Sequence, residues 1–164
     1  MSITFEPLGM QHQSAVMAIF NHYVRTSTAA FPGNPLPEPF FAMFLKKSEG
    51  GYPAYTVLSG GTVIGFCQLS PYNPMSSFVS AACVTCFLDP EYTGRGIGSE
   101  CLYKLEADGR AMNISQLIAE VSSENRESLR FHEKNGFFRV GELRDIGRKL
   151  GRSFSVVLMQ KELN

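Results

Sequence analysis

Three alternate glycines, Gly94, Gly96 and Gly98, separate a strand-like apolar run from a helix-like segment. The first backbone N–H groups of a helix have no partner within it, and the helix dipole places partial positive charge there. Because glycine has no Cβ, a ligand can approach this backbone closely. Arg95, inside the loop, adds a planar cationic donor. These residue types in this order predict a site for a phosphate or pyrophosphate group of a cofactor.

Two common phosphate-binding motifs do not fit this loop. The P-loop needs Gly-Lys-Ser/Thr after its last glycine, whereas Gly98 is followed by Ser99 and Glu100. The dinucleotide fingerprint needs a third glycine where Ser99 stands. A glycine-rich turn without a ligand is the plain alternative, although three glycines and an arginine at a strand-to-helix junction exceed what a turn needs.

The elements that position this loop follow from apolar periodicity and turn residues. Helices are predicted at 11–24, from Glu38 or Pro39 to about Gly50, at 96–112 and at 124–135. Strands are predicted at 3–5, 54–58, 63–69, 78–88, 117–121, 137–145 and 154–161. This order predicts an α+β fold built around a mixed sheet.

The composition is typical of one globular domain spanning residues 1–164. The 15 basic and 15 acidic side chains balance, so no net field favours nucleic acid or an anionic membrane. No apolar run approaches the roughly 20 residues of a membrane span, and the first residues lack the basic region of a signal peptide. We therefore expect a cytoplasmic protein with no nucleic acid and no membrane as partner.

Cys83 and Cys86 form a C-x-x-C pair, a pattern also found in redox and zinc sites. They fall in a predicted strand, where residues three apart point to opposite faces and cannot easily share a bond or a metal ion. No second C-x-x-C pair accompanies them. We therefore expect no metal site, and free, mostly buried thiols in a reducing compartment at Cys67, Cys83, Cys86 and Cys101.

Three segments resemble one family. Residues 88–98, LDPEYTGRGIG, are similar to the acetyl-CoA signature of the Gcn5-related N-acetyltransferases (GNAT), with Thr93 where arginine or glutamine is usual. Residues 21–31, NHYVRTSTAAF, and 125–137, NRESLRFHEKNGF, resemble the phosphinothricin-acetyltransferase-like branch. The segments occur in the branch's order and spacing, so the resemblance covers nearly the whole chain.

The resemblance implies the GNAT fold, in which the fourth and fifth strands splay apart and the pantetheine arm of acetyl-CoA (CoA) lies in the gap. The implied cofactor contacts are Cys86, Phe87, Leu88, Gly94, Arg95, Gly96, Ile97, Gly98, Ser99, Asn125 and Ser128. Asn125 also suits a helix N-cap, and both roles can hold together. The branch further implies a homodimer, with mild support from the 13 phenylalanines.

Acetyl transfer requires the acceptor amine to lose a proton, a donor for the oxyanion, and a proton or solvation for the leaving thiolate. By resemblance, the glutamate of phosphinothricin-type enzymes falls at Cys83 and the superfamily's usual tyrosine acid falls at Phe131. Three catalytic candidates remain: His132, Glu120 acting through water, and Cys83 as a nucleophile. Each has a structural alternative, as a hydrogen-bonded histidine, a solvated carboxylate or a buried packing thiol. A reaction without a protein base also stays open.

The resemblance places the acceptor pocket at Tyr23, Arg25, Thr28, Phe31, Tyr72 and the loop 73–78. That loop carries basic residues in phosphinothricin-type enzymes, whereas here it reads NPMSSF. We therefore expect poor activity on phosphinothricin and a preference for a less anionic or more apolar amine. The acceptor would be a small molecule such as an amino-acid analogue, or a protein N-terminus. Two alternatives are a non-catalytic acyl-CoA-binding sensor or partner module of the same fold and, more remotely, a nucleotide-phosphate binder of another fold.

Overall fold

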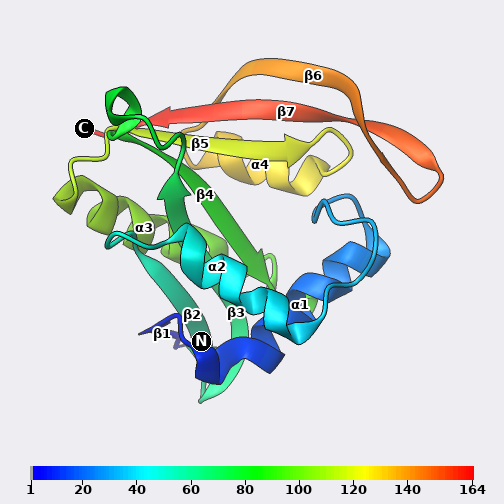
Figure 1. The fold of residues 1–164 in the computed structure, drawn as a ribbon, viewed down its shortest axis with the longest axis horizontal. Coiled ribbons are helices and arrows are strands. Elements are labelled where there is room, and N and C mark those ends of the chain that lie inside the picture. The colour runs from blue at the N-terminus through cyan, green and yellow to red at the C-terminus, as the bar shows by residue number, and fades with distance from the viewer. Residues whose placement is uncertain (1) are drawn as a thin grey trace.

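A seven-stranded mixed sheet forms the centre of the protein in the computed structural model, which describes residues 2–164 (Figure 1). The strands are β1 (Thr4–Pro7), β2 (Ala54–Ser59), β3 (Thr62–Pro71), β4 (Ala81–Leu88), β5 (Gln116–Ser122), β6 (Phe138–Lys149) and β7 (Arg152–Glu162). The helices are α1 (Gln13–Thr26), α2 (Phe41–Lys47), α3 (Ile97–Ala111) and α4 (Arg126–Lys134). The predicted α+β class and mixed sheet are confirmed.

The strand order is β1-β2-β3-β4-β5-β7-β6, and β4 and β5 are the parallel pair. These two strands pair over three positions only, ending at Cys83 opposite Ile118. Beyond that point they separate, while β4 stays paired with β3 as far as Leu88. The edge of β4 that faces β5 therefore has no strand partner over residues 84–88. In Figure 1 the gap opens toward the right-hand side.

Alternating side chains divide the core between the two faces of the sheet. On one face α1 and α2 cover a cluster that includes Phe20, Phe44 and Phe66. On the other face α3 and α4 cover a larger cluster that includes Leu102 and Met159. Burial of one such side chain contributes about 1.5–3 kcal/mol. The two clusters therefore hold the helices in place on both faces of the sheet, on either side of the gap between β4 and β5.

The β6–β7 hairpin departs from the predicted strand ends. The sequence pattern stops the first of these strands at 145 and places Gly147 in the turn, whereas β6 continues to Lys149. A Cβ on Gly147 would overlap the ring of Phe154, so glycine lets this ring lie across β6. Register shifts between Leu143 and Gly147 interrupt the alternation on which the prediction relied.

The predicted strand 78–88 is wrong at its start. Residues Ser76–Phe78 form a single 3-10 turn, and β4 begins at Ala81. The first strand is Thr4–Pro7 rather than 3–5, and other helix and strand ends differ by a few residues, as fraying ends commonly do. Within residues 2–164, no helix is long and apolar enough to span a membrane.

Candidate active site

The glycine loop joins the end of β4 to α3. After Leu88, the carboxylate of Asp89 accepts a hydrogen bond from the Glu91 N–H at 2.9 Å and caps a single 3-10 turn. Gly94 and Gly96 then adopt φ of 73° and 84°, a left-handed conformation that side chains with a Cβ rarely take. Gly96 is the N-cap of α3 and provides no side-chain cap.

The loop has the features of an anion cradle. None of the backbone N–H groups of residues 94–99 donates a hydrogen bond to another group in the described part of the chain. A Cβ built on Gly94 or Gly96 would meet nothing within 4 Å, so the outer face of the loop is open. The residues therefore fit the pyrophosphate of a CoA molecule.

Arg95 lies beside this cradle. Its guanidinium carbon lies 5.4 Å from the centre of the Tyr92 ring, a cation–π contact that orients the side chain. Arg95 forms no ion pair within residues 2–164. Its charge is therefore available where Thr93 leaves the signature without its usual arginine or glutamine.

Gly98, in the first turn of α3, lies in close contact with Phe131, in the middle of α4. A Cβ built on Gly98 would lie 2.8 Å from Cε1 of Phe131, which is well inside van der Waals contact. The glycine at this position therefore allows the Phe131 ring to pack over the first turn of α3. A phenyl ring has no proton to donate, so Phe131 contributes packing rather than acid catalysis.

The beginning of α4 carries Asn125 and Ser128, the two polar residues predicted to contact the far end of the cofactor arm. The side-chain oxygen of Asn125 accepts a hydrogen bond from the Ser128 N–H at 3.2 Å, so Asn125 caps α4. Ser128 Oγ lies 3.3 Å from His132 Nδ1. Contact of Asn125 and Ser128 with the cofactor stays a prediction.

His132 is held by its own helix. Its Nδ1 lies 2.7 Å from the Ser128 carbonyl oxygen, which favours the tautomer with the proton on Nδ1. The ring packs edge-on against Phe131 and Phe137. Burial lowers its pKa below the usual 6.5. This setting supports a neutral structural histidine on the α4 side of the sheet.

The lowered pKa of His132 predicts acid sensitivity. The unfolded chain binds a proton near pH 6.5 while the folded imidazole stays neutral, so the free energy of unfolding should fall as the pH drops below that value. Denaturant titrations at pH 7 and pH 5 should show a smaller loss in His132→Gln than in the natural protein. His22→Gln, at an exposed histidine on α1, is the control. An unchanged pH dependence in His132→Gln would contradict this role.

The face of the sheet that α1 and α2 cover carries the other two catalytic candidates. Cys83 is the last β4 residue paired with β5, opposite Ile118, and Glu120 lies two residues further along β5 on the same face. Burial first, and then the charge of Glu120, raise the pKa of the Cys83 thiol. A raised pKa keeps Cys83 protonated and argues against a nucleophilic thiolate. The structure thus brings Cys83 and Glu120 together and leaves His132 on the opposite face.

Two of the predicted acceptor residues are engaged in internal hydrogen bonds. The Tyr23 hydroxyl donates to the Leu88 carbonyl at the end of β4, and burial followed by the charge of Asp89 raises its pKa to about 12. Thr28 is 2% exposed, and its hydroxyl lies 2.6 Å from Ser122 Oγ and 3.1 Å from a Glu124 carboxylate oxygen. Both side chains therefore hold neighbouring segments of the chain in place beside the gap, and their hydroxyl groups are already hydrogen-bonded within the protein.

The remaining predicted acceptor residues do not form one pocket. Phe31 stacks on Phe154 of β7 at the open end of the gap, and Arg25 is exposed near the end of α1. Tyr72 packs on Phe78 beside the start of β4, at the closed end. Thr28 and Tyr72 are thus separated by the length of β5, about 20 Å for its seven residues.

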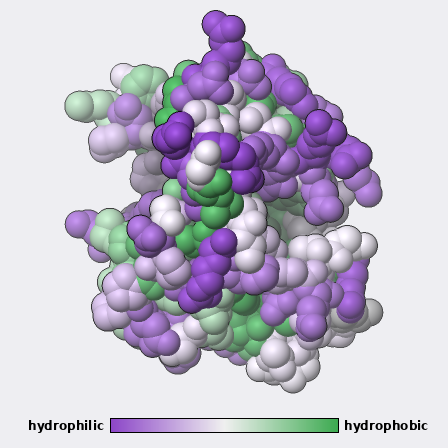
Figure 2. All heavy atoms as spheres, turned by 90° about the vertical axis from the view of Figure 1, so that its right-hand side faces the viewer, coloured by the Kyte–Doolittle hydropathy of each residue, from purple (hydrophilic) through white to green (hydrophobic). Residues whose placement is uncertain are grey.

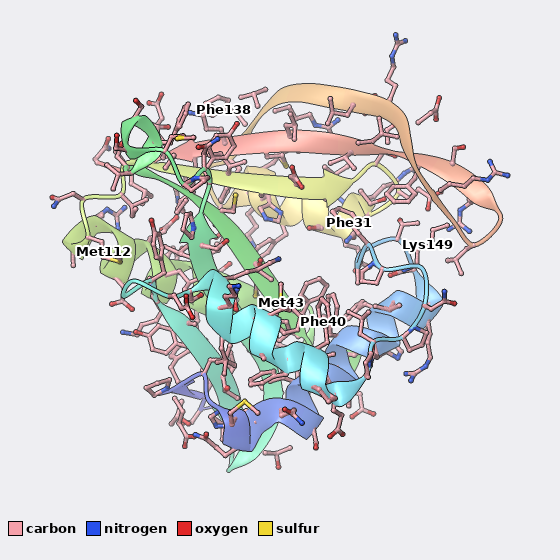
Figure 3. All side chains as sticks on the ribbon, viewed as in Figure 1. Phe31, Phe40, Met43, Met112, Phe138 and Lys149 are labelled. Atoms are coloured by element: carbon pink, nitrogen blue, oxygen red, sulfur yellow. The ribbon has the colours of Figure 1, made fainter. Side chains whose placement is uncertain are left out.

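Lys149 is a positioning residue that sequence reasoning missed. Its ammonium donates to the Ser27 carbonyl at 2.6 Å and to the Ala30 carbonyl at 2.7 Å, and burial lowers its pKa. These bonds tie the loop after α1 to the β6–β7 hairpin (Figure 3). More than one hundred residues separate the partners, so the spacing of residues along the sequence gives no signal for these contacts.

The molecular surface is hollowed on the side where the gap between β4 and β5 opens. Seen from the right-hand side of Figure 1, hydrophilic atoms cover the upper part of the molecule, and hydrophobic atoms show where the surface is hollowed below it (Figure 2). Among residues 2–164, no cluster of three or more His, Cys, Asp or Glu side chains could hold a metal ion. The site therefore offers an anion cradle on one face and a carboxylate on the other.

Comparison with known proteins agrees with this geometry. The Acetyltransferase (GNAT) family matches residues 16–137. The chain is 34% identical over 152 residues to a phosphinothricin N-acetyltransferase of Alcaligenes faecalis, covering 92% of this chain and 77% of that protein. It is 30% identical over 149 residues to one of Streptomyces coelicolor, covering 88% and 87% respectively.

A solved structure gives the same fold. A GNAT superfamily phosphinothricin acetyltransferase from Sinorhizobium meliloti, in complex with acetyl-CoA, superposes with a TM-score of 0.93 at 26% identity. The match covers all of this chain and 90% of that one. The chain with the Gly94–Ser99 cradle and the splayed β4 and β5 belongs to the acetyltransferase (GNAT) family and is an acetyl-CoA-dependent N-acetyltransferase.

Proposed function

We propose that the acceptor is the amine of a small molecule, which attacks the acetyl group directly while both substrates are bound. The observation that carries this proposal is the position of Glu120, on the acceptor face of β5 where β4 loses its strand partner. The relatives named above, phosphinothricin N-acetyltransferases, support a small acceptor. Their names also favour catalysis over a non-catalytic binding module.

One face of the sheet binds the cofactor, and the other face binds the acceptor amine and accepts its proton. The N–H groups of the glycine loop hold the pyrophosphate on the α3 side, and the unpaired edge of β4 near Cys86 and Phe87 offers backbone N–H groups to the developing oxyanion. Glu120 accepts the amine proton, directly or through one water molecule. The amine nitrogen bonds to the thioester carbonyl carbon as the carbonyl π bond opens to the oxyanion. The carbonyl then re-forms as the C–S bond breaks, and CoA leaves as a thiolate that takes up a proton.

The acceptor site proposed here is poorly matched to phosphinothricin as a substrate. The loop 73–78 is uncharged, and the α2 side of the gap exposes apolar side chains at Phe40 and Met43. We therefore propose a less anionic, more apolar amine. A phosphinothricin kcat/KM equal to that of the best amine in a panel would contradict this part of the proposal.

Thermal unfolding with acetyl-CoA, CoA or ATP tests the cofactor site first. A ligand that binds only the folded state must raise the midpoint by mass action, so acetyl-CoA and CoA should raise it and ATP should not. CoA release is then measured with a panel of amines. Stabilisation without any acetyl transfer would favour the non-catalytic module, and stabilisation by ATP alone would favour the nucleotide-binding alternative.

A homodimer and a cytoplasmic location complete the proposal. β6 is an edge strand whose apolar side chains Phe138, Val140, Leu143 and Ile146 are exposed. Exposed apolar edges tend to be covered by another chain. The four free cysteines support a reducing compartment.

The dimer predicts a charge-sensitive interface on β6. Ile146→Asp would place a carboxylate within the covered surface, so sedimentation at micromolar concentration should shift from dimer to monomer. Tyr103→Asp, at an exposed aromatic residue on α3, is the control and should remain dimeric. A natural protein that sediments as a monomer would remove the basis for this proposal.

A further inference from the structure

Three of the four cysteines lie together in the core on the α3 side of the sheet. Cys67 of β3 and Cys101 of α3 belong to the larger core cluster, and Cys86 of β4 packs against it. Cys67 and Cys101 are 0% exposed, whereas Cys86 is only partly buried. The acetyl transfer proposed above uses none of these three side chains.

The register of β3 and β4 places Cys67 directly opposite Cys86. Hydrogen-bonded and non-hydrogen-bonded pairs alternate along an antiparallel ladder. Ile64 and Asp89 form a hydrogen-bonded pair, in which the Asp89 N–H donates to the Ile64 carbonyl at 2.7 Å. Cys67 and Cys86 stand three positions further along the same ladder, so they form a non-hydrogen-bonded pair, the type in which opposite side chains lie closer.

A non-hydrogen-bonded pair has the dimensions that a disulfide requires. Its Cα atoms lie about 4.5 Å apart, inside the span of roughly 4.4–6.8 Å that disulfides bridge. Cys83, by contrast, stands opposite Ser70, and its side chain points to the other face of the sheet. Cys67 and Cys86 are therefore the two cysteines that strand pairing prepares for a covalent link.

The third thiol makes the pair reactive. Hydrogen bonds from Cys67 and Cys86 lower the pKa of Cys101 to about 5, so the cluster holds a thiolate at neutral pH. Proton transfer along such a hydrogen bond moves the negative charge from Cys101 to Cys86. Cys86 is the member that is only partly buried, and it lies on the stretch of β4 whose edge has no strand partner. A small oxidant that enters the gap between β4 and β5 therefore meets Cys86 first.

We propose that Cys86 and Cys67 are a modification site, where a hydroperoxide produces a reversible disulfide. With hydrogen peroxide, the Cys86 thiolate attacks one oxygen and the O–O bond breaks. Cys86 becomes a sulfenic acid, and the departing hydroxide takes up a proton. The Cys67 sulfur then attacks the Cys86 sulfur and loses its proton, while hydroxide leaves and becomes water with a proton. Two thiols are oxidised to one disulfide, and one peroxide is reduced to two molecules of water.

The cofactor should protect this site. Acetyl-CoA that lies in the gap between β4 and β5 covers the unpaired edge of β4 and blocks the path to Cys86. The enzyme is thus open to oxidation while the gap is empty and closed to it while the cofactor is bound.

The test counts free thiols by alkylation in denaturant and intact mass. The reduced protein has four cysteines to alkylate, and after hydrogen peroxide we expect two, with all four restored by dithiothreitol. Acetyl-CoA at about ten times its Kd should slow the loss about tenfold, because the free form falls by that factor. Added oxygen that dithiothreitol does not remove, with no paired thiols, would overturn the proposal. Equal rates with and without acetyl-CoA would overturn the access route.

Matched alanine variants identify the pair. Cys83→Ala should still lose two thiols, and so should Cys101→Ala, although more slowly because it lacks the thiolate. Cys86→Ala and Cys67→Ala should lose none. A disulfide in Cys86→Ala would assign the bond to Cys67 and Cys101 and contradict the proposal. Because Cys86 is only partly buried, Cys86→Ala carries the test if Cys67→Ala does not fold.

These measurements are independent of the acceptor. They need neither acetyl transfer nor a known amine, so a negative result would leave the proposed function standing. Conversely, a protein that transfers no acetyl group would still show the disulfide.

Discussion

Replacement of Glu120 by glutamine should lower kcat by about a hundredfold and leave acetyl-CoA binding unchanged. General base catalysis commonly contributes roughly 10²–10⁴-fold, and glutamine keeps the shape of the side chain while removing its basicity. Glu120 is exposed on β5 and forms no ion pair with any of the described residues 2–164, so folding should not depend on it. The measurement is initial-rate CoA release at saturating acceptor, with acetyl-CoA affinity from the shift of the unfolding midpoint.

The control variants decide which candidate acts. Glu162→Gln removes another exposed carboxylate from the sheet, at the end of β7, and should leave kcat unchanged. Cys83→Ser and His132→Gln should retain most of the rate, because the Cys83 thiol is protonated and His132 lies on the other face. Full activity in Glu120→Gln together with a large loss in Cys83→Ser would reverse the assignment in favour of a nucleophilic thiol.

Gly98→Ala should lower both the free energy of unfolding and the affinity for acetyl-CoA. The added methyl would lie 2.8 Å from the Phe131 ring, so that ring or the first turn of α3 must shift. Insertion of a methyl group into a packed contact typically costs about 1–3 kcal/mol. Movement of the first turn of α3 would also displace the N–H groups of the anion cradle. Chemical denaturation and the acetyl-CoA-dependent shift of the midpoint measure the two effects.

A double variant tests the cause. Phe131→Leu removes the ring atoms that the new methyl would strike, so Gly98→Ala should cost less in the Phe131→Leu background than alone. Gly94→Ala is the control for backbone strain, because a Cβ there meets nothing within 4 Å and costs only the positive φ. Additive losses in the double variant would show that the contact with Phe131 is not the reason.

The sequence alone determined the cofactor side of this protein. The anion cradle is local: Gly94, Gly96 and Gly98 follow one strand and begin one helix, so chain order itself brings the N–H groups together. The N-cap role of Asn125 is local for the same reason, since its partner Ser128 lies three residues away. Short-range geometry is encoded in spacing, which is why these features could be predicted before the fold was known.

Only the tertiary structure decided the acceptor side. Lys149 meets Ser27 and Ala30 across more than one hundred residues, and spacing gives no signal for such a contact. The pattern of β6 was misjudged because bulges and the Phe154 ring over Gly147 interrupt its alternation. The sequence left three catalytic candidates open, and the sheet then placed them. Strand pairing and the two-residue period of β5 set Glu120 beside Cys83. His132 belongs to α4, which packs on the other face of the sheet.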